Sequence, residues 1–215
     1  MYQLCVFDLD GTLVNTISDL TDSLNFALAH YNYPTFSEFE VMKLVGHSTA
    51  YMCKNALPEA DRDAMWRPVH REFTAHYEEN CTNQSRPYNG ILRMLSELKN
   101  AGIRLAVASN KPHKHAMQVL ETLFPRDCFS MILGMMEKFE KKPAPDALQF
   151  VMDYFSVDPA DTVYVGDSEV DIAFAHNAGV DCISCSWGLR PRSVLTESGA
   201  TCIVDDPEEI IEKVL

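Results

Sequence analysis

A short apolar run that begins at Leu4 ends in two aspartates, Asp8 and Asp10, followed by Gly11. The run has the length of a buried strand. Residues two apart on a strand share a face, so both carboxylates would point into one crevice. Like charges this close repel each other unless a cation neutralises them, and Mg²⁺ prefers such oxygen ligands. Gly11 would let the backbone turn with free N–H groups that suit a phosphate. The pattern alone also fits a polar turn.

Polar side chains follow two other predicted strands in the same way. In open parallel sheets the carboxyl ends of the strands meet at one edge, where ligands bind, so we expect these side chains near the two aspartates. A basic pair, Lys141 and Lys142, lies between them in the sequence and is followed by prolines. Each residue alone fits a helix cap or a surface charge, whereas their joint occurrence favours a site. The polar side chains that follow the two strands are Ser109 and Asn110, after the strand at 103–108, and Asp167, with Asp171 one helical turn later, after the strand at 162–165.

The apolar periodicity predicts an α/β protein with a helical insert. From residue 87 onward strands alternate with helices, which indicates a Rossmann-like parallel sheet with helices on both faces. Residues 15–80 instead show apolar residues at helical spacing, such as Ile17, Leu20 and Leu24, and no convincing strand. We therefore predict a core domain of residues 1–14 and 84–215 and a helical domain of residues 15–83. Further strands are predicted at 128–133, 181–186 and 201–204.

The composition limits the classes of partner. A net charge of −13 over 215 residues argues against nucleic acid and anionic membranes, because both need basic patches. There is no apolar run of about 18 residues that would predict a membrane span, and no leader pattern precedes the first strand. Seven scattered cysteines fit a reducing cytoplasm. Cys182 and Cys185 would be plain buried thiols on opposite faces of a strand.

The motifs, taken in order, resemble those of haloacid dehalogenase superfamily hydrolases that carry a helical cap after the first motif. The resemblance covers essentially the whole chain and, within the superfamily, is greatest to phosphoglycolate phosphatases. It implies a Rossmann-like core, a cap over the site and Mg²⁺ as the cofactor. The motifs are Asp8-Leu9-Asp10-Gly11-Thr12, then Ser109-Asn110, then Lys142 within Lys-Pro-Ala-Pro, then Gly166-Asp167-Ser168-Glu169-Val170-Asp171.

This resemblance assigns the catalytic and metal-binding roles. It implies that Asp8 is the nucleophile and forms an aspartyl-phosphate. Asp10 would be the general acid for the leaving oxygen and then the general base for water. Mg²⁺ would be held by the Asp8 carboxylate, the backbone carbonyl of Asp10 and the carboxylate of Asp167.

The resemblance also implies a set of phosphate-binding groups. Ser109 and Lys142 would hold the phosphoryl oxygens, and free N–H groups near Gly11 and at Asn110 would add to them. Lys142 is preferred to Lys141 because it directly precedes Pro143, as the family pattern requires. Asp171 would orient Lys142 or a metal-bound water.

A turn in the predicted cap, Gly46-His47-Ser48, is expected to face the core. His47 either contacts a carboxylate of the substrate or is a solvated turn histidine, and the sequence leaves both interpretations open. Trp187 and Arg190 could line the rim of the site. His113 and His115, at the start of a predicted helix, are interpreted as solvated.

The function implied by the resemblance is Mg²⁺-dependent hydrolysis of a small phosphorylated metabolite, with 2-phosphoglycolate the first candidate. The alternatives are a phosphatase for pyrophosphate, nucleotides or sugar phosphates, and a phosphomutase with the same residues. A non-catalytic binding protein on this fold is an alternative from another class. The predicted protein is cytoplasmic, a monomer or a homodimer, with no nucleic-acid or membrane partner.

Overall fold

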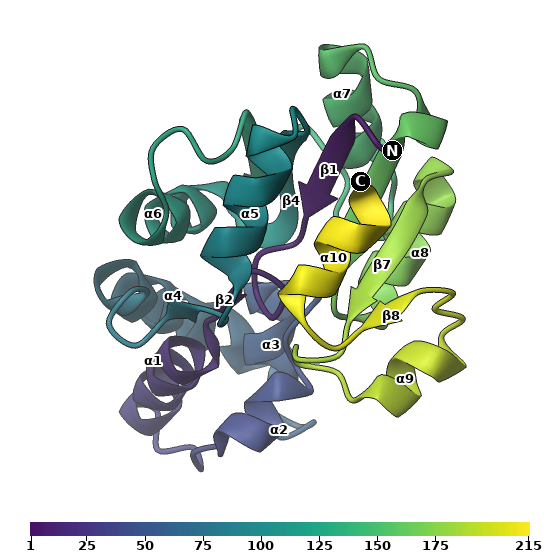
Figure 1. The fold of residues 1–215 in the computed structure, drawn as a ribbon. Helices are drawn as coiled ribbons and strands as arrows, with labels where there is room; N and C mark the ends of the chain where they lie inside the picture. The colour runs from purple at the N-terminus through teal and green to yellow at the C-terminus, as the bar shows by residue number, and fades with distance from the viewer.

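A six-stranded sheet forms the centre of the protein, which we describe from a computed structural model covering residues 1–215. Every neighbouring pair of its strands is parallel, and their order is β5-β4-β1-β6-β7-β8 (Figure 1). The α/β fold with a Rossmann-like parallel sheet is therefore confirmed. The strands are β1 Leu4–Phe7, β4 Arg104–Pro112, β5 Met131–Met135, β6 Thr162–Gly166, β7 Asp181–Cys185 and β8 Ile203–Val204.

The first strand, β1, lies in the middle of the sheet. It pairs with β4 on one side and β6 on the other, so that Leu4 is opposite Arg104 and Thr162. The strand order therefore changes direction at β1, and a crevice forms at the carboxyl ends of the strands at such a point. All four residues of β1 are fully buried, because helices cover both faces of a parallel sheet.

Helices cover both faces of the sheet and bury alternate residues of each strand. Cys5 and Phe7 belong to a large apolar cluster that includes residues of α5, α6 and α10, whereas Leu4 and Val6 belong to a second cluster with α7 and α8. Figure 1 shows α5 and α10 in front of the sheet. The helices of the sheet domain are α5 Ile91–Asn100, α6 His113–Leu123, α7 Asp146–Phe155, α8 Glu169–Ala178, α9 Arg192–Glu197 and α10 Pro207–Val214, with a short 3-10 helix at Pro159–Asp161.

Four further helices form the segment that we call the helical insert, residues 17–80. A two-stranded antiparallel ribbon, β2 (Val14–Asn15) with β3 (Arg86–Pro87), joins the insert to the sheet domain. In Figure 1 the insert lies below the sheet, beyond the carboxyl end of β1. The division into domains at residues 14/15 and 83/84 stays a prediction. The helices of the insert are α1 Ile17–His30, α2 Glu38–Met42, α3 Thr49–Asn55 and α4 Arg62–Asn80.

Three local predictions differ from the structure. The strand predicted at 128–133 is β5 (Met131–Met135), because Cys128 and Phe129 pack against the core from a loop rather than a strand. Helix α10 was not predicted, although Asp206 and Glu209 form a capping box at its start. The short strand β3 (Arg86–Pro87), which pairs with β2, was also not predicted.

The prediction that Cys182 and Cys185 lie on opposite faces of a strand is confirmed, but only Cys185 is buried, and Cys182 is half-buried. Cys185 packs in the cluster of α5 and α10, whereas Cys182 packs against the cluster of α7 and α8, so the two thiols lie on opposite faces of the sheet. All seven cysteines are free thiols. Burial raises the pKa of the Cys182 thiol to about 12, which makes it a poor nucleophile.

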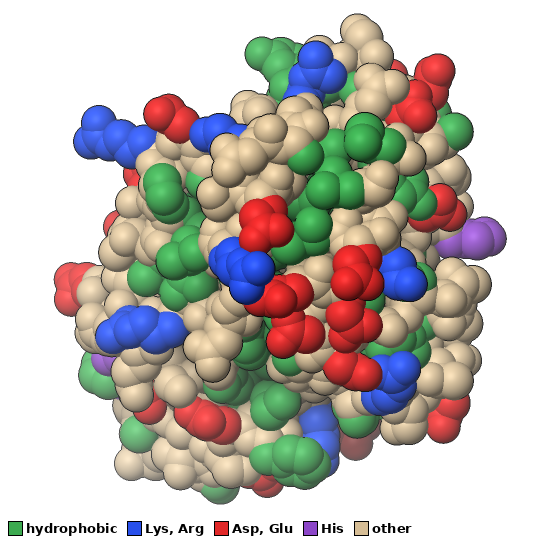
Figure 2. Space-filling view, viewed as in Figure 1, with side chains coloured by type: hydrophobic (Ala, Val, Ile, Leu, Met, Phe, Trp, Pro, Cys, Tyr) green, Lys and Arg blue, Asp and Glu red, His purple; other side chains and the backbone are tan.

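The surface reflects the acidic composition. Figure 2 shows acidic side chains gathered over α10, where Glu208 and Glu209 occupy the first turn. None of the helices is both long enough and apolar enough to cross a membrane. The absence of a nucleic-acid partner and the oligomeric state stay predictions.

Candidate active site

The turn after β1 is shaped by Gly11. Its φ is +90°, a left-handed conformation that side chains other than glycine rarely adopt. A Cβ atom at this position would also lie 2.3 Å from Oδ2 of Asp167. Glycine is therefore required both by the backbone conformation and by the approach of the Asp167 carboxylate. The turn leaves Asp8 beside Asp167, whereas the side chain of Asp10 is held by Lys111 and Thr16.

Three buried carboxylates converge at the carboxyl end of β1. Asp8, Asp167 and Asp171 each place an oxygen within 4.8 Å of the others, and none is more than 6% exposed. Burial raises the pKa of Asp8 to about 6, although Lys142 acts against this shift. Burial, followed by the charges of Asp171 and Asp8, raises the pKa of Asp167 well above its usual value. Such a cluster is stabilised by added positive charge.

Asp171 is already fully partnered by groups of the protein. Its Oδ1 accepts hydrogen bonds from Lys142 Nζ at 2.7 Å and from the Tyr164 hydroxyl at 3.1 Å. Its Oδ2 accepts from the Ser168 hydroxyl at 2.6 Å and from two backbone N–H groups. Burial opposes its charge, yet Lys142, together with the hydrogen bonds from Ser168 and Tyr164, outweighs this effect and lowers the pKa of Asp171. Asp171 therefore serves as an anchor for its neighbours, in keeping with the orienting role that the resemblance implies.

Asp8 and Asp167 have oxygens that fit a divalent cation. Asp8 Oδ1 is buried and forms an ion pair with Lys142 Nζ at 3.0 Å, but it accepts no further hydrogen bond. Each oxygen of Asp167 accepts one hydrogen bond, from the Thr12 hydroxyl at 2.9 Å and from the Leu189 N–H at 2.7 Å. A carboxylate oxygen can accept further interactions, so this donor set of hard oxygens suits Mg²⁺.

Lys142, in the loop between β5 and α7, points its ammonium group into the carboxylate cluster. Its Nζ contacts Asp8, Asp171 and the Tyr164 hydroxyl, the last at 2.9 Å. The whole side chain is buried, whereas the neighbouring Lys141 is exposed. Burial disfavours its charge, but Asp171 and Asp8 more than compensate and raise the pKa of Lys142. The structure thus brings Lys142, and not Lys141, to the aspartates.

Ser109 and Asn110 lie on the part of β4 that extends past the end of β1. Ser109 lines the same crevice as Asp8. The Asn110 side chain accepts a hydrogen bond from Lys142 N at 2.8 Å and donates to the carbonyls of Lys142 and Gly46, both at 3.2 Å. Asn110 therefore ties the lysine loop and the helical insert to the sheet.

The side chain of Asp10 is directed away from the carboxylate cluster. Its oxygens lie 2.9 and 3.1 Å from Lys111 Nζ, and one of them accepts a hydrogen bond from the Thr16 hydroxyl at 2.8 Å. Lys111 also donates to the Tyr77 hydroxyl on α4 of the insert, at 2.6 Å. Burial opposes the charge of Lys111, but Asp10 and Tyr77 together outweigh this effect and raise the pKa of the lysine.

Sequence reasoning missed Lys111 and Tyr77. Lys111 directly follows Ser109-Asn110 and is 4% exposed. The available signal was a lysine at the end of a predicted buried strand. Lysine is rarely buried without a partner, so this position indicated a buried ion pair. The interpretation of His115 as solvated is wrong. It is 3% exposed and packs edge-on against Tyr77, with the ring centroids 5.2 Å apart.

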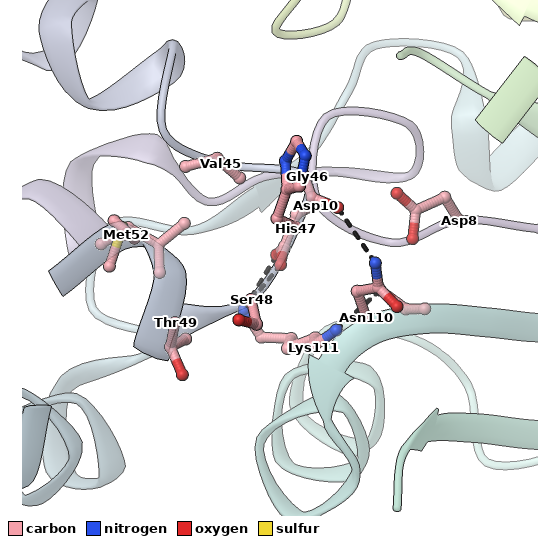
Figure 3. Close-up of a pocket in the computed structure, with 12 residues that line it drawn as sticks. Asp8, Asp10, Val45, Gly46, His47, Ser48, Thr49, Met52, Asn110 and Lys111 are labelled. Carbon is pink, nitrogen blue, oxygen red and sulfur yellow. Dashed lines mark hydrogen bonds and ion pairs between the residues drawn. The ribbon is translucent and has the colours of Figure 1, made fainter. Parts of the chain in front are cut away.

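A small cavity of about 40 Å³ lies between the sheet and the insert. Figure 3 shows Asp8 and Asn110 on one side of it, facing Val45 and Met52 of the insert. His47 also lines the cavity and stacks on Tyr51, with the ring centroids 4.5 Å apart. The full lining is Asp8, Asp10, Leu20, Val45, Gly46, His47, Ser48, Thr49, Met52, Ser109, Asn110 and Lys111.

Comparisons with known proteins agree with this geometry. Residues 5–185 match the family model of haloacid dehalogenase-like hydrolases. A phosphoglycolate phosphatase of Haemophilus influenzae (strain 86-028NP) is 34% identical over 217 residues, which cover 98% of this chain and 97% of the relative. A phosphoglycolate phosphatase of Agrobacterium fabrum is 37% identical over 213 residues, which cover 94% of this chain and 88% of that protein.

Solved structures show the same arrangement. A candidate phosphoglycolate phosphatase from Lactobacillus delbrueckii subsp. bulgaricus superimposes with a TM-score of 0.95 at 31% identity, covering 100% of this chain and 98% of the other. A predicted phosphoglycolate phosphatase from Haemophilus somnus 129PT gives a TM-score of 0.92 at 33% identity, with the same coverage. The likeness extends over both the sheet domain and the helical insert, since the whole chain is matched.

Proposed function

This chain belongs to the haloacid dehalogenase-like hydrolases and is a phosphoric monoester hydrolase, and we propose that its substrate is 2-phosphoglycolate. The convergence of Asp8, Asp167 and Lys142 at the end of β1 carries the proposal for the chemistry. The names of the relatives and the small cavity under the insert support the choice of substrate.

Asp8 and Asp167 would hold Mg²⁺, together with the backbone carbonyl of Asp10. Asp8 Oδ1 has only Lys142 as a partner, and the pKa of Asp167 is raised. Both observations support this choice, because Lys142 is the one cation that pairs with the three clustered carboxylates. When bound, the metal ion supplies positive charge that draws the phosphoryl group to the carboxylates and stabilises the charge that develops on it.

Asp8 would act as the nucleophile. One of its carboxylate oxygens forms a bond to phosphorus while the bond from phosphorus to the ester oxygen breaks, which gives an aspartyl-phosphate and releases the alcohol. Lys142 lies 3.0 Å from this carboxylate, and Ser109 lines the same crevice. Both would bind phosphoryl oxygens as negative charge develops on them, together with backbone N–H groups near Gly11 and at Asn110.

Asp10 would transfer the protons. It gives a proton to the leaving ester oxygen and then takes one from the water that attacks the aspartyl-phosphate. Its side chain is held by Lys111 and Thr16, outside the group of carboxylates formed by Asp8, Asp167 and Asp171. This separation keeps the carboxylate out of the metal-binding cluster, and only its backbone carbonyl would face the ion.

The insert would act as a cap that selects the substrate and excludes water. The cavity of about 40 Å³ under the insert is small, which favours a compact substrate. His47, which lines it, would donate a hydrogen bond to a substrate carboxylate as a neutral imidazole, because burial lowers the pKa of His47. We place the reaction in the cytoplasm.

Phosphate release from a panel of substrates, with and without Mg²⁺, tests the proposal. The panel contains 2-phosphoglycolate, pyrophosphate, a sugar phosphate and a nucleotide. A Mg²⁺-dependent preference for 2-phosphoglycolate is expected. Equal rates on all four would keep the chemistry and reject the substrate. No release from any of them, with phosphate transfer between sugar phosphates, would favour a phosphomutase. No reaction of either kind would favour a binding protein.

A further inference from the structure

Arg190, which lies after β7 on the sheet domain, binds the helical insert. Its Nη1 donates a hydrogen bond to the backbone carbonyl of Met42 at 2.6 Å, and its Nη2 donates to that of Val45 at 2.7 Å. Its Nε pairs with Glu169 on α8 at 2.9 Å. The residue is only 9% exposed. One planar guanidinium thus joins two carbonyls of the insert to a carboxylate of the sheet domain.

The two residues before Arg190 contact the carboxylate cluster. Leu189 donates its N–H to Asp167 Oδ2 at 2.7 Å. A Cβ atom on Gly188 would lie 2.3 Å from the Cβ of Asp167, so the backbone packs directly on this aspartate. The partner of Arg190, Glu169, is two residues after Asp167 in the sequence. The segment from Gly188 to Arg190 therefore touches both Asp167 and the insert.

The part of the insert that Arg190 binds leads directly into the wall of the cavity. Val45, Gly46 and His47 all line it. Gly46 has a φ of +112°, and a Cβ atom there would lie 3.4 Å from Arg190 Nη2. Apart from Arg190, the side chain of Asn110 also holds this turn, through the carbonyl of Gly46 at 3.2 Å. The ribbon of β2 and β3 that joins the insert to the sheet domain is formed by other residues.

We propose that Arg190 is a positioning residue that holds the turn of residues 45–48 over the reacting phosphoryl group and so determines the affinity for substrate. Arg190 itself does not line the cavity. It acts by fixing the carbonyls of Met42 and Val45 relative to Asp167. The choice of 2-phosphoglycolate as the probe rests on the proposed function, whereas the holding of the turn does not.

The first test is amide hydrogen exchange in the full-length protein without substrate, comparing Arg190→Met with the wild type. Loss of the charged donor should raise the exchange rate of the amides at residues 43–48 by about tenfold or more, because hydrogen bonds to a charged group contribute strongly. Exchange in β1 should not change. Unchanged exchange at 43–48 in a folded variant would overturn the proposal.

The second test is steady-state kinetics with 2-phosphoglycolate. Arg190→Met should raise KM by about tenfold, because the hydrogen bonds from the guanidinium to the insert are lost. The change in kcat should be much smaller. Arg190→Lys should give a smaller rise, because an ammonium group cannot reproduce the planar fork. A fall in kcat at constant KM would overturn the positioning role.

Arg192→Met is the matched control. Arg192 is exposed and pairs with Asp205, away from the insert, so its loss should change neither exchange nor KM. If Arg190→Met fails to fold, Arg190→Lys carries both tests. A protein that does not hydrolyse 2-phosphoglycolate, but whose Arg190→Met variant shows faster exchange at 43–48, would reject the substrate and keep the role of Arg190.

Discussion

Lys142 Nζ lies 2.7 Å from Asp171 Oδ1, and this buried ion pair holds the lysine against Asp8. Tyr164 completes the arrangement, since its hydroxyl contacts both charged groups. Removing one partner of a buried ion pair is costly, because the other charge is left without its counterion. The pair therefore provides a direct test of how the lysine is positioned.

Asp171→Asn should weaken both stability and activity. The free energy of unfolding is expected to fall by about 2 to 4 kcal/mol, because Lys142 loses its closest counterion. Turnover should fall by about tenfold or more, as for other residues that orient a functional group. Urea unfolding and phosphate release measure the two effects. Asp205→Asn, which removes an exposed carboxylate paired with Arg192, is the control and should leave both unchanged.

Asp8→Asn should abolish turnover while the protein stays folded. We expect a loss of at least about a thousandfold, the scale seen when a nucleophile is removed. The free energy of unfolding should change by only about 1 kcal/mol, because relief of repulsion from Asp167 offsets the lost ion pair with Lys142. Single-turnover assays and urea unfolding check both statements. Retention of wild-type turnover would refute the assignment of the nucleophile.

Lys111→Met should reduce kcat more than it raises KM, because Lys111 holds Asp10 rather than the nucleophile. An approximate tenfold to hundredfold loss of kcat is expected from a misplaced proton-transfer group. Tyr77→Phe removes only the hydroxyl that binds Lys111 and should have a smaller effect. Lys54→Met, at an exposed lysine paired with Asp63, is the control. Equal kcat values for Lys111→Met and this control would exclude the role.

Protonation of His115 should destabilise the protein in acid. Burial, followed by the charge of Lys111, lowers the pKa of His115 from 6.5 to about 4. The unfolded state therefore binds the proton first as the pH falls, so the stability present above 6.5 is lost between 6.5 and about 4. The loss has an upper limit of about 3 kcal/mol.

Urea unfolding of the wild type and of His115→Leu over this pH window measures the effect. The difference between the two free energies of unfolding should change in favour of the variant as the pH falls, because leucine cannot bind the proton. A difference that does not depend on pH would show that His115 is not the titrating group.

Local features of the sequence were sufficient to predict much of the fold. The strand β1 and its aspartates follow from a four-residue apolar run, and the alternation of strands and helices indicates a parallel sheet. Ser109 was predicted near Asp8 because polar residues at the carboxyl ends of parallel strands share one edge, whereas Lys142 was preferred to Lys141 on the resemblance to the family motif. These predictions depend on periodicity within single elements, which is readable without contacts.

The errors concern segments whose residues have two interpretations. Cys128 and Phe129 extend an apolar run and so resemble the start of a strand, but they pack from a loop that precedes β5. His115 lies next to Lys114 in a polar stretch, yet it faces Tyr77. Which way such residues point depends on the elements that pack against them.

The sequence by itself determined which strand ends carry the chemistry, because the types and spacing of Asp8, Asp10 and Asp167 are local properties. Only the tertiary structure decided which charges pair. Lys111 donates hydrogen bonds to Asp10, which is 101 residues away in the sequence, and to Tyr77, which is 34 residues away. Arg190 donates a hydrogen bond to Val45, which is 145 residues away. Such contacts arise from the packing of the helical insert on the sheet domain, and side-chain periodicity within one element contains no information about that packing.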